Sequence, residues 1–425
     1  MKKFTLSMLL GLLLVLGLIV GVQSAYAAAG SLDPNFGNGG VTITASSTGF
    51  IVAYSLKLQS DGKILVLVQA GDETSEVLRY TSSGKLDTTF GSNGIAVLPT
   101  AFSPLFGSMA IQSNGQIVVA GEVSAPGNGA AAFGLQRLTA NGTPDKTFGN
   151  DGLAVASIGF PGTDAVLLIE PDGDILLGGQ LEPTGRRQPF QIALARFTSA
   201  GDLDTTFGNQ GTVAVPSIGG CTALALLSTD EILVVNAQGI AQFAPTGGLE
   251  STVTGGSIVV SAGSNSPSLP SIFQENGDYL FGTELFTGEE SRGHNAAAEV
   301  LRFTATGAAD TTFANPTFHY VGTGGSGIEA LVNALAVQSN GDIVVVGNQI
   351  TFARSGDVTV NGLARLTPNG ELDPTFGNGG TVVNSVPAGT QEINGVVIQP
   401  ADDNIITVGI ANNDSELALA RYLSK

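Results

Sequence analysis

Short apolar runs separated by turn residues fill most of this chain, in the same order each time. A run such as Met109–Ile111 leads to Asn114-Gly115 and then to a second run, residues 116–121. Runs of this length rich in Val, Ile and Leu predict strands, and Asn-Gly or Asp-Gly between them predicts a tight two-residue hairpin. The hairpins, two of them without glycine, number seven and so predict seven repeat units: Asp61-Gly62, Asn114-Gly115, Asp172-Gly173, Thr229-Asp230, Asn276-Gly277, Asn340-Gly341 and Asp402-Asp403.

A third apolar segment, a short motif and a fourth apolar run complete each unit. The motif, which we call the cassette, has the consensus Leu-Asp-x-Thr-Phe-Gly-x-x-Gly and recurs about every 58 residues. Its repeated aspartates and phenylalanines are Asp33, Phe36, Asp87, Phe90, Asp145, Phe148, Asp204, Phe207, Asp310, Phe313, Asp373 and Phe376. An arginine precedes the cassette in the third segment: Arg79, Arg137, Arg196, Arg302, Arg365 and Arg421.

The residue types of the cassette favour a structural role. An aspartate at a turn accepts the N–H two residues on, and glycine allows a left-handed bend into the fourth strand. We expect the phenylalanines to fill the wedge between neighbouring units, and the arginines to pair with a carboxylate or carbonyl of the next cassette. Metal sites on the cassette aspartates are the alternative, but one carboxylate falls short of the roughly six to eight oxygens that Ca²⁺ takes.

Four short strands in each of seven units predict an all-β fold, a seven-bladed β-propeller with four-stranded antiparallel blades. The two ends of the chain complement each other, because a cassette and a fourth strand stand at the start and a third strand stands at the end. The N-terminal strand would complete the last blade and close the ring, which protects the sheet edges. A linear solenoid would instead need an atypical cap at each end.

Residues 1–27 are expected to be a secretory signal peptide, and residues 28–425 the propeller. Lys2 and Lys3 precede an apolar run that is short for a membrane anchor, and Ala25-Tyr26-Ala27 fits a cleavage site. Cleavage removes two lysines and changes the net charge from −19 to −21. This charge argues against nucleic acid and anionic lipid, and allows cationic partners, Ca²⁺ included. We expect a secreted or periplasmic protein.

The cassette at residues 203–208, the hairpin at residues 169–176 and the segment Ala195-Arg196-Phe197 resemble the delta-60 repeat family of bacterial β-propellers. The resemblance covers essentially all of the chain after the leader and implies the propeller fold. This family has no common activity, so the resemblance implies no catalytic residues. The fourth unit departs from the pattern, with Val253 in the phenylalanine position and Gln242 in the arginine position. Its regularity is therefore in question.

Residues with catalytic chemistry are sparse. Cys221 aligns with the start of a core strand, and we expect a buried, inert thiol. Of the two histidines, His294 and His319, the second is expected at the surface. Residues 322–327 match G-x-G-x-x-G but lead into a strand, whereas a dinucleotide site needs a helix there. These glycines are therefore expected to form a loop between blades.

Two polar loops are the candidate ligand-binding sites, because loops of rigid scaffolds often carry binding residues. The first holds Glu289, Glu290, Arg292 and His294. The second places Arg186 and Arg187 on an otherwise acidic protein. A solvated loop without a role is the alternative at each place.

The sequence thus favours a monomeric, exported module that binds or scaffolds without catalysis. Its partner would be a protein, a carbohydrate or a small molecule, with no nucleic acid and no stable membrane insertion. No catalytic residue and no cofactor are assigned, and Ca²⁺ is left open without named ligands. The alternative is a Ca²⁺-dependent hydrolase or lactonase acting on an exported sugar or acyl compound, since such a site needs only Asp, Glu and Asn side chains.

Overall fold

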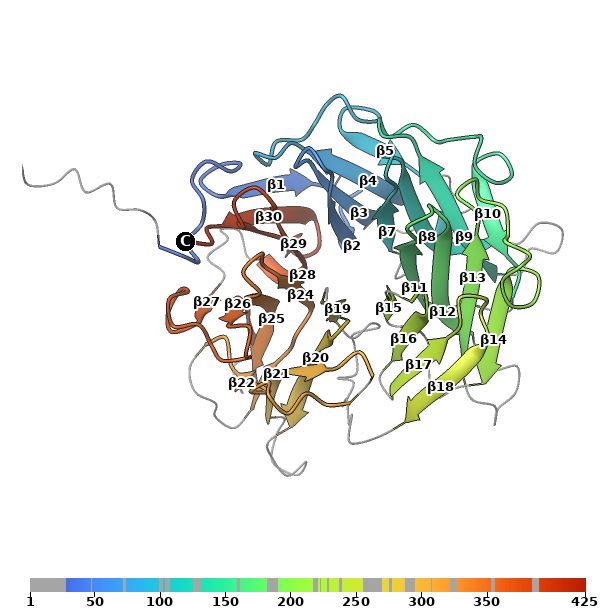
Figure 1. The fold of residues 1–425 in the computed structure, drawn as a ribbon. Coiled ribbons are helices and arrows are strands. Elements are labelled where there is room, and N and C mark those ends of the chain that lie inside the picture. Colours follow the sequence, from blue (N-terminus) through green and yellow to red (C-terminus); the bar gives the residue numbers. More distant parts are fainter. Residues whose placement is uncertain are drawn as a thin grey trace, which may run out of the picture.

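The protein is an all-β structure whose sheets are arranged around a common centre (Figure 1). The computed structural model describes residues 28–425 except 47, 72–73, 99–101, 104–107, 125–130, 159–160, 182–189, 217–220, 222, 228, 237–238, 255–269, 275–276, 287–294, 307, 322–326, 353–355 and 384–389. The described residues form strands β1 to β30 and no helix. The all-β prediction is therefore confirmed.

Three units each form one four-stranded antiparallel sheet, with the first strand nearest the centre and the fourth at the rim (Figure 1). The first unit contains β2 (Ile51–Leu58), β3 (Ile64–Ala70), β4 (Thr74–Tyr80) and β5 (Ile95–Val97). The third contains β11 (Pro161–Ile169), β12 (Ile175–Leu181), β13 (Gln191–Phe197) and β14 (Thr212–Pro216). The fourth contains β15 (Ala223–Leu226), β16 (Ile232–Asn236), β17 (Gly239–Phe243) and β18 (Leu249–Thr254).

The second and seventh units vary this plan. In the second unit two short strands, β6 (Phe102–Ser103) and β7 (Met109–Ile111), both pair with β8 (Ile117–Ser124), which is followed by β9 (Ala131–Leu138) and β10 (Leu153–Ala156). The seventh unit contains β28 (Thr390–Ile398), β29 (Ile405–Ala411) and β30 (Glu416–Tyr422). Its fourth strand comes from the other end of the chain, since β1 (Val41–Ala45) pairs antiparallel with β30.

The two chain ends also share one turn. The N–H of Gly30 donates to the carbonyl of Leu423 at 2.8 Å, and the N–H of Leu423 donates to the carbonyl of Ser31 at 2.9 Å. In the first unit the equivalent N–H of Gly84 donates to the carbonyl of Thr81 at 2.9 Å, within a continuous hairpin. The ends of the chain therefore build together the turn that other units build from one segment.

The fifth and sixth units share a nine-stranded sheet, so the described strands form six sheets and not seven separate blades. The fifth unit contains β19 (Ser271–Phe273), β20 (Tyr279–Phe286), β21 (Asn295–Phe303) and β22 (Thr317–Phe318); the sixth contains β24 (Ala334–Val337), β25 (Ile343–Thr351), β26 (Val358–Leu366) and β27 (Thr381–Val383). Between them β23 (Ile328–Ala330) pairs parallel with β21 and antiparallel with β25. Because β22 covers only Ala298 and Glu299 of β21, the preceding residues of β21 are open to β23.

The hairpin turns differ from the two-residue turns that the sequence predicts. In the first unit the N–H of Gln59 donates to the carbonyl of Lys63, and the N–H of Gly62 donates to the carbonyl of Gln59. Only Gly62 of the Asp-Gly pair has positive φ, at 80°, because Asp61 bends back to accept the N–H of Lys63. This is a three-residue loop with its glycine in the left-handed region. Asp230 and Asp403 adopt the same conformation without glycine, at 63° and 58°.

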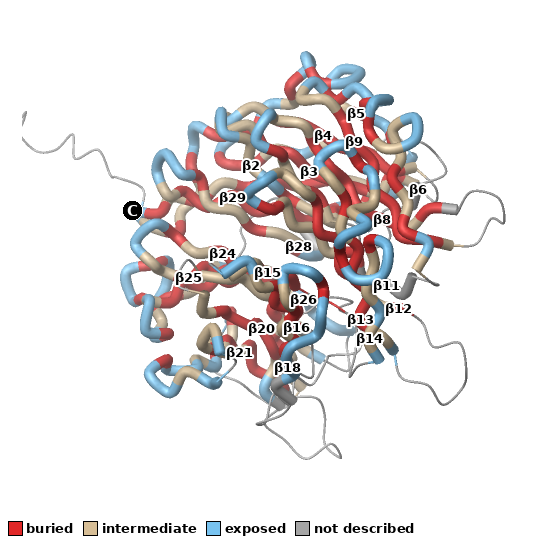
Figure 2. Tube along the Cα trace, turned by 45° about the vertical axis from the view of Figure 1, so that its right-hand side comes forward, coloured by how far each residue is buried: buried red, intermediate tan, exposed pale blue. Residues whose placement is uncertain are grey.

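The core lies between adjacent sheets. One cluster joins Leu65 and Leu67 of β3 to Ile117 and Val119 of β8. Similar clusters lie at other contacts between the sheets of neighbouring units, and we call each such contact a seam. Figure 2 shows the strands largely buried and the turns exposed. Burial on both faces explains why the strands are continuous apolar runs rather than alternating ones.

Candidate functional site

Six units end in a corner structure that ties each unit to its neighbour. In the second unit, Nε of Arg137 donates to Oδ2 of Asp145 at 2.8 Å, and Nη1 donates to the carbonyl of Ser199 in the third unit at 2.6 Å. The guanidinium carbon lies 4.5 Å from the centre of the Phe148 ring. One side chain thus contacts a carboxylate, an aromatic ring and the next unit, and we call this arrangement a locked corner.

The cassette supplies the shape of the corner. Oδ1 of Asp145 accepts the N–H of Thr147 at 3.0 Å and its hydroxyl at 2.6 Å. Phe148 is fully buried, and a Cβ on Gly201, in the turn of the third unit, would lie 2.8 Å from its ring. Glycine is required there both for this approach and for a φ of 93°. The phenylalanine therefore lies in the wedge between two units.

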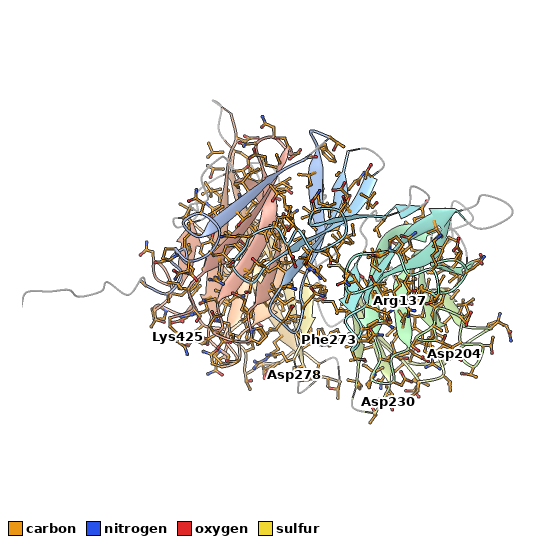
Figure 3. All side chains as sticks on the ribbon, turned by 90° about the horizontal axis from the view of Figure 1, so that it is seen from above. Arg137, Asp204, Asp230, Phe273, Asp278 and Lys425 are labelled. Carbon is orange, nitrogen blue, oxygen red and sulfur yellow. The ribbon has the colours of Figure 1, made fainter. Side chains whose placement is uncertain are left out.

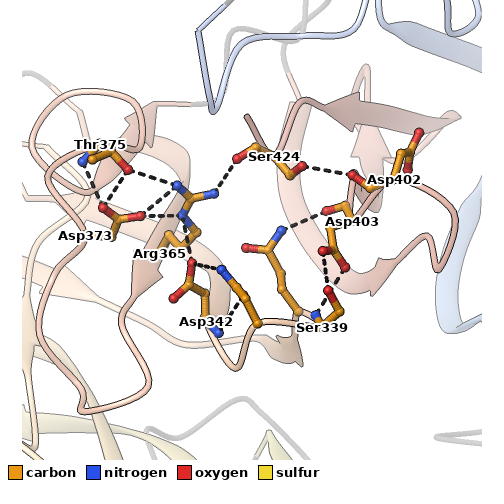
Figure 4. Close-up of polar contacts among 10 residues, drawn as sticks. Ser339, Asp342, Arg365, Asp373, Thr375, Asp402, Asp403 and Ser424 are labelled. Atoms are coloured by element: carbon orange, nitrogen blue, oxygen red, sulfur yellow. Dashed lines mark hydrogen bonds and ion pairs between the residues drawn. The ribbon is translucent and has the colours of Figure 1, made fainter.

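The same contacts recur at the other locked corners. Figure 4 shows the corner of Arg365, where Asp373 and Thr375 contact the guanidinium, and Nη1 reaches the carbonyl of Ser424. Beside it the hydroxyl of Ser339 donates to Asp403 across the same seam. For Arg79, Arg137, Arg196, Arg302, Arg365 and Arg421 in turn, the accepting carbonyls are those of Ala140, Ser199, Pro245, Pro368, Ser424 and Ser82.

At five of the six locked corners the pKa of the cassette aspartate is lowered: Asp87, Asp145, Asp204, Asp310 and Asp373. The hydroxyl of Thr89 and, with smaller effects, its N–H and the Arg79 guanidinium lower the pKa of Asp87 to about 2 despite burial. The hydroxyl of Thr312 likewise lowers the pKa of Asp310 to about 2. Burial alone would raise the pKa of Asp145, but its hydrogen bonds outweigh burial and lower it. These carboxylates are committed to ion pairs, which makes them poor proton donors near neutral pH.

The fourth unit has an open corner in place of a locked one. Its sheet is complete, but β18 follows β17 directly after the turn at residues 244–248, so no cassette fold intervenes. Gln242 donates to Oε2 of Glu231 at 2.9 Å and accepts the hydroxyl of Ser251 at 3.3 Å, both within its own unit. By position, the carbonyl that an arginine would reach is that of Ala305 in the fifth unit. Among the described residues, no arginine contacts it.

An aromatic side chain partly fills this seam. The second strand begins with isoleucine in the other six units: Ile64, Ile117, Ile175, Ile232, Ile343 and Ile405. There the isoleucine packs with the cassette phenylalanine of the preceding unit, as Ile117 does with Phe90. In the fifth unit Tyr279 packs with Leu233 of the fourth unit and stacks on Phe303, with ring centres 5.2 Å apart. The larger ring thus takes over part of the volume of the missing phenylalanine.

Two hydroxyls on this face of the fifth unit are buried without a hydrogen-bond partner among the described residues. Tyr279 is 1% exposed and Thr283, on the same side of β20, is 5% exposed. Thr283 lies opposite Glu299 of β21 in the sheet register. Burial raises the pKa of Tyr279 and that of Glu299. Buried polar groups are normally satisfied, so these two hydroxyls stand out in a seam whose cluster is otherwise apolar.

The fourth and fifth units also carry the most one-sided charge. Between Arg196 and Arg292 the chain has ten Asp and Glu residues and no Lys, Arg or His. In Figure 3, Asp230 of the fourth unit and Asp278 of the fifth lie toward the same side of the molecule. The open corner therefore belongs to a part of the sequence whose acidic residues have no basic residue among them.

The hairpin of the third unit offers one group that could hold a cation. Carboxylate oxygens of Glu170, Asp172 and Asp174 lie within 4.8 Å of one another. Arg196 is 4.0 Å from Glu170, and Asp174 accepts the N–H of Ser199 at 3.1 Å. Three carboxylates supply at most part of the oxygen shell of Ca²⁺, and the rest would be water.

A hollow of about 760 Å³ lies at the rim beside β1. It is lined by β1, with Thr42 and Ile43, and by Gly84 and Leu86 of the first unit. Of these lining residues, Thr42 donates its hydroxyl to the carbonyl of Gly84 at 2.6 Å. This hollow adjoins the locked corner of Arg421.

The predicted ligand-binding residues Glu289, Glu290, Arg292, His294, Arg186 and Arg187 lie outside the described residues. The leader, residues 1–27, also lies outside them. Cys221 is fully buried and packs with Leu224 and Phe207, which confirms the prediction of a buried thiol. His319, expected at the surface, is half-buried, and burial lowers its pKa.

Sequence reasoning missed Tyr279 and Thr283. The signal for Tyr279 is present in the alignment of the units, since six begin the second strand with isoleucine and one with tyrosine. For Thr283 no signal exists, because threonine is an ordinary strand residue.

Four segments, residues 59–90, 112–148, 170–207 and 338–376, match a family described as a β-propeller domain of unknown function (DUF5122). The fourth and fifth units lie between the third and fourth matched segments. No curated protein matches the chain. The matched segments support a β-propeller repeat protein.

Solved structures show a similar fold. A catalytically inactive virginiamycin B lyase from Staphylococcus aureus with quinupristin is 14% identical, with a TM-score of 0.50, over 90% of this chain and 99% of that one. The WD40 domain of Pan2 from Neurospora crassa is 11% identical, with a TM-score of 0.50, over 93% of this chain and 98% of that one. At this identity the likeness concerns the fold alone. In the part of the chain that the structure describes, no helix is long and apolar enough to span a membrane.

Proposed function

We propose that the seven units form a seven-bladed β-propeller closed by β1 as the fourth strand of the last blade. The two halves of the nine-stranded sheet, β19–β22 and β24–β27, each have the pairing of a complete unit, which supports two blades there. The pairing of β1 with β30 and the bond from Arg421 to the carbonyl of Ser82, at 2.9 Å, support closure. Residues 28–425 would be one propeller, exported behind a leader at residues 1–27 to the periplasm or the medium.

We infer that this propeller is a non-catalytic binding or scaffold module that meets its partner through the fourth and fifth units. The observation that carries this function is the open corner. At six corners the polar and aromatic groups are committed to contacts between units, whereas at the fourth those groups are missing, within a stretch of ten acidic and no basic residues. Charge complementarity then favours a partner with positive charge. The module would act as a monomer.

Binding of the mature protein to immobilised poly-arginine, measured by biolayer interferometry at several salt concentrations, tests this function. Neutralising Glu231, Glu250 and Asp278 to their amides is expected to weaken binding about tenfold. The control neutralises Asp61, Asp151 and Glu371, which are exposed and lie in other units. An equal loss of affinity in the two triple variants would mean that binding depends only on the net negative charge of the protein. That result would contradict the proposed binding region.

A Ca²⁺-dependent hydrolase or lactonase is the second candidate, favoured by the three carboxylates of the third-unit hairpin. Ca²⁺ bound only by the folded state would raise the melting temperature, and EDTA would reverse the rise. Asp172→Asn should remove the effect while Asp151→Asn keeps it. A melting temperature that does not respond to Ca²⁺ would count against this candidate.

A further inference from the structure

We propose that the open corner between the fourth and fifth units is a docking site for an arginine side chain presented by a partner protein. This inference rests on the proposed binding function and deepens it by naming the group that is recognised. The chain itself shows, at six other corners, what such a site requires.

Each locked corner gives an arginine three contacts: a carboxylate, a carbonyl of the next unit and an aromatic ring. At the corner of Arg302 these are Asp310 at 2.7 Å, the carbonyl of Pro368 at 2.8 Å, and the ring of Phe313 with its centre 4.7 Å away. The six rings lie 4.5 to 5.0 Å from their guanidinium carbons, so the geometry is closely repeated. The set of contacts, and not any single one, defines the recognition of a guanidinium.

The open corner keeps acceptors but has no guanidinium of its own. Glu231 accepts hydrogen bonds from two neutral groups, the hydroxyl of Thr229 at 3.0 Å and the amide of Gln242 at 2.9 Å, and Glu250 is exposed. The turn of the fifth unit places the carbonyl of Ala305 where the other units place the accepting carbonyl, by alignment of the Thr-x-x-Gly turns. An arginine from outside would find carboxylate and carbonyl acceptors on the two sides of the seam.

The seam also contains a buried aromatic ring, 1% exposed, whose hydroxyl has no partner among the described residues. Tyr279 occupies the position that faces the cassette phenylalanine in other units, and its hydroxyl is buried without a partner among the described residues. A guanidinium has five N–H donors in one plane and stacks on aromatic rings. It can therefore satisfy this hydroxyl as well as the carboxylates, which a hydrophobic side chain could not do.

An apolar surface is available for the stem of the incoming side chain. Leu249 is 43% exposed, whereas the cassette leucines Leu86 and Leu203 are half-buried. The methylenes of arginine cover apolar surface while the charged end stays in polar surroundings. Arginine is favoured over lysine because its planar group can contact a carboxylate, a carbonyl and a ring at once.

Titration of the mature protein with a short acetylated peptide of glycine and serine around one central arginine tests the proposal. The control peptide carries citrulline, which has the shape of arginine without its charge, and both are followed by NMR. The arginine peptide is expected to bind saturably and at least about tenfold more tightly than the citrulline peptide. Gln242→Arg, which supplies the missing guanidinium from within, should abolish binding.

Asn378→Arg adds the same charge at an exposed position beside a locked corner and should change binding by less than about twofold. Tyr279→Phe keeps the ring, loses the hydroxyl and should weaken binding about threefold. Circular dichroism confirms that each variant is folded. Equal affinity for the two peptides, or equal losses in Gln242→Arg and Asn378→Arg, would overturn the docking site. If neutralising Glu231, Glu250 and Asp278 weakens poly-arginine binding as expected while Gln242→Arg leaves peptide binding intact, the binding function stands and this inference fails.

Discussion

The seam between the sixth and seventh units and the seam between the fourth and fifth units join similar sheets by different means. In the first, the guanidinium of Arg365 donates a hydrogen bond across the seam to the carbonyl of Ser424. Its carbon atom lies 4.7 Å from the centre of the Phe376 ring. In the second, Tyr279 packs into the seam and Gln242 stays within its own unit. One repeat therefore supports two kinds of seam, a charged lock and an aromatic contact.

The difference shows what the lock contributes beyond packing. Both seams are buried and apolar near the centre, since both contain a hydrophobic cluster. Only the locked seam also fixes the rim, where two guanidinium nitrogens of Arg365 contact Oδ2 of Asp373 and a third donates to a backbone carbonyl, which together specify one geometry. The open seam leaves the rim with acceptors that are free to meet another molecule.

Removing a cassette phenylalanine from a locked corner should cause the largest change in the free energy of unfolding. Phe148→Ala deletes a fully buried ring from a locked seam and is expected to lower the free energy of unfolding by about 3–5 kcal/mol. Equilibrium unfolding in urea measures it. Leu249→Ala at the open corner is the control and should cost no more than about 0.5 kcal/mol, because that side chain is exposed. Similar losses in both variants would mean that the two corners do not differ in packing.

Converting a locked corner into an open one should have an intermediate effect. Arg365→Gln gives the sixth unit the residue of the fourth and removes the guanidinium from Oδ2 of Asp373 and from the carbonyl of Ser424. We expect a loss of about 2 kcal/mol in the free energy of unfolding, typical of a hydrogen bond to a charged group. Arg365→Lys should recover only part of it, because lysine lacks the planar fork. A loss below about 0.5 kcal/mol would show that the lock is not a stabilising contact.

Removing the hydroxyl of Tyr279 from the seam at the open corner should cause the smallest change in the free energy of unfolding. The change should be an increase, whereas the other two variants lower it. Tyr279→Phe takes away a buried group without a described partner and should raise the free energy of unfolding by about 1 kcal/mol. Tyr80→Phe is the matched control, because the hydroxyl of Tyr80 is bonded to Thr44 at 2.7 Å and its loss should lower stability by a similar amount. Thermal and urea unfolding of the two variants give the comparison. A loss of stability in both would mean that the hydroxyl of Tyr279 is satisfied.

Much of the fold could be predicted from the sequence, because local chemistry repeats with the units. Apolar runs around Asn-Gly or Asp-Gly turns indicate antiparallel sheets in any context. The turn type could not be predicted, since Asp61 selects a three-residue loop by a hydrogen bond to Lys63 that a two-residue pattern does not reveal. The insertion of β23 between two units could not be predicted either, because it depends on how short β22 is in the folded chain.

The candidate site was only partly accessible from the sequence. The departure of the fourth unit is visible at Gln242 and Val253, and it indicates the correct units for the open corner. What fills the seam is a long-range contact, and Tyr279 is recognisable only once the units are superimposed. The predicted loop residues around His294 remain a prediction, because they lie outside the described residues.

The turn shared by Gly30 and Leu423 has a consequence for how the chain folds. β1 is synthesised long before its partner β30, and Arg421 bonds to a residue 339 positions away. Contacts of such separation are slow to form, because the entropy of closing a long loop opposes them until the rest is in place. β1 therefore stays unpaired until β30 has been synthesised, and an unpaired edge strand is prone to aggregation during that time.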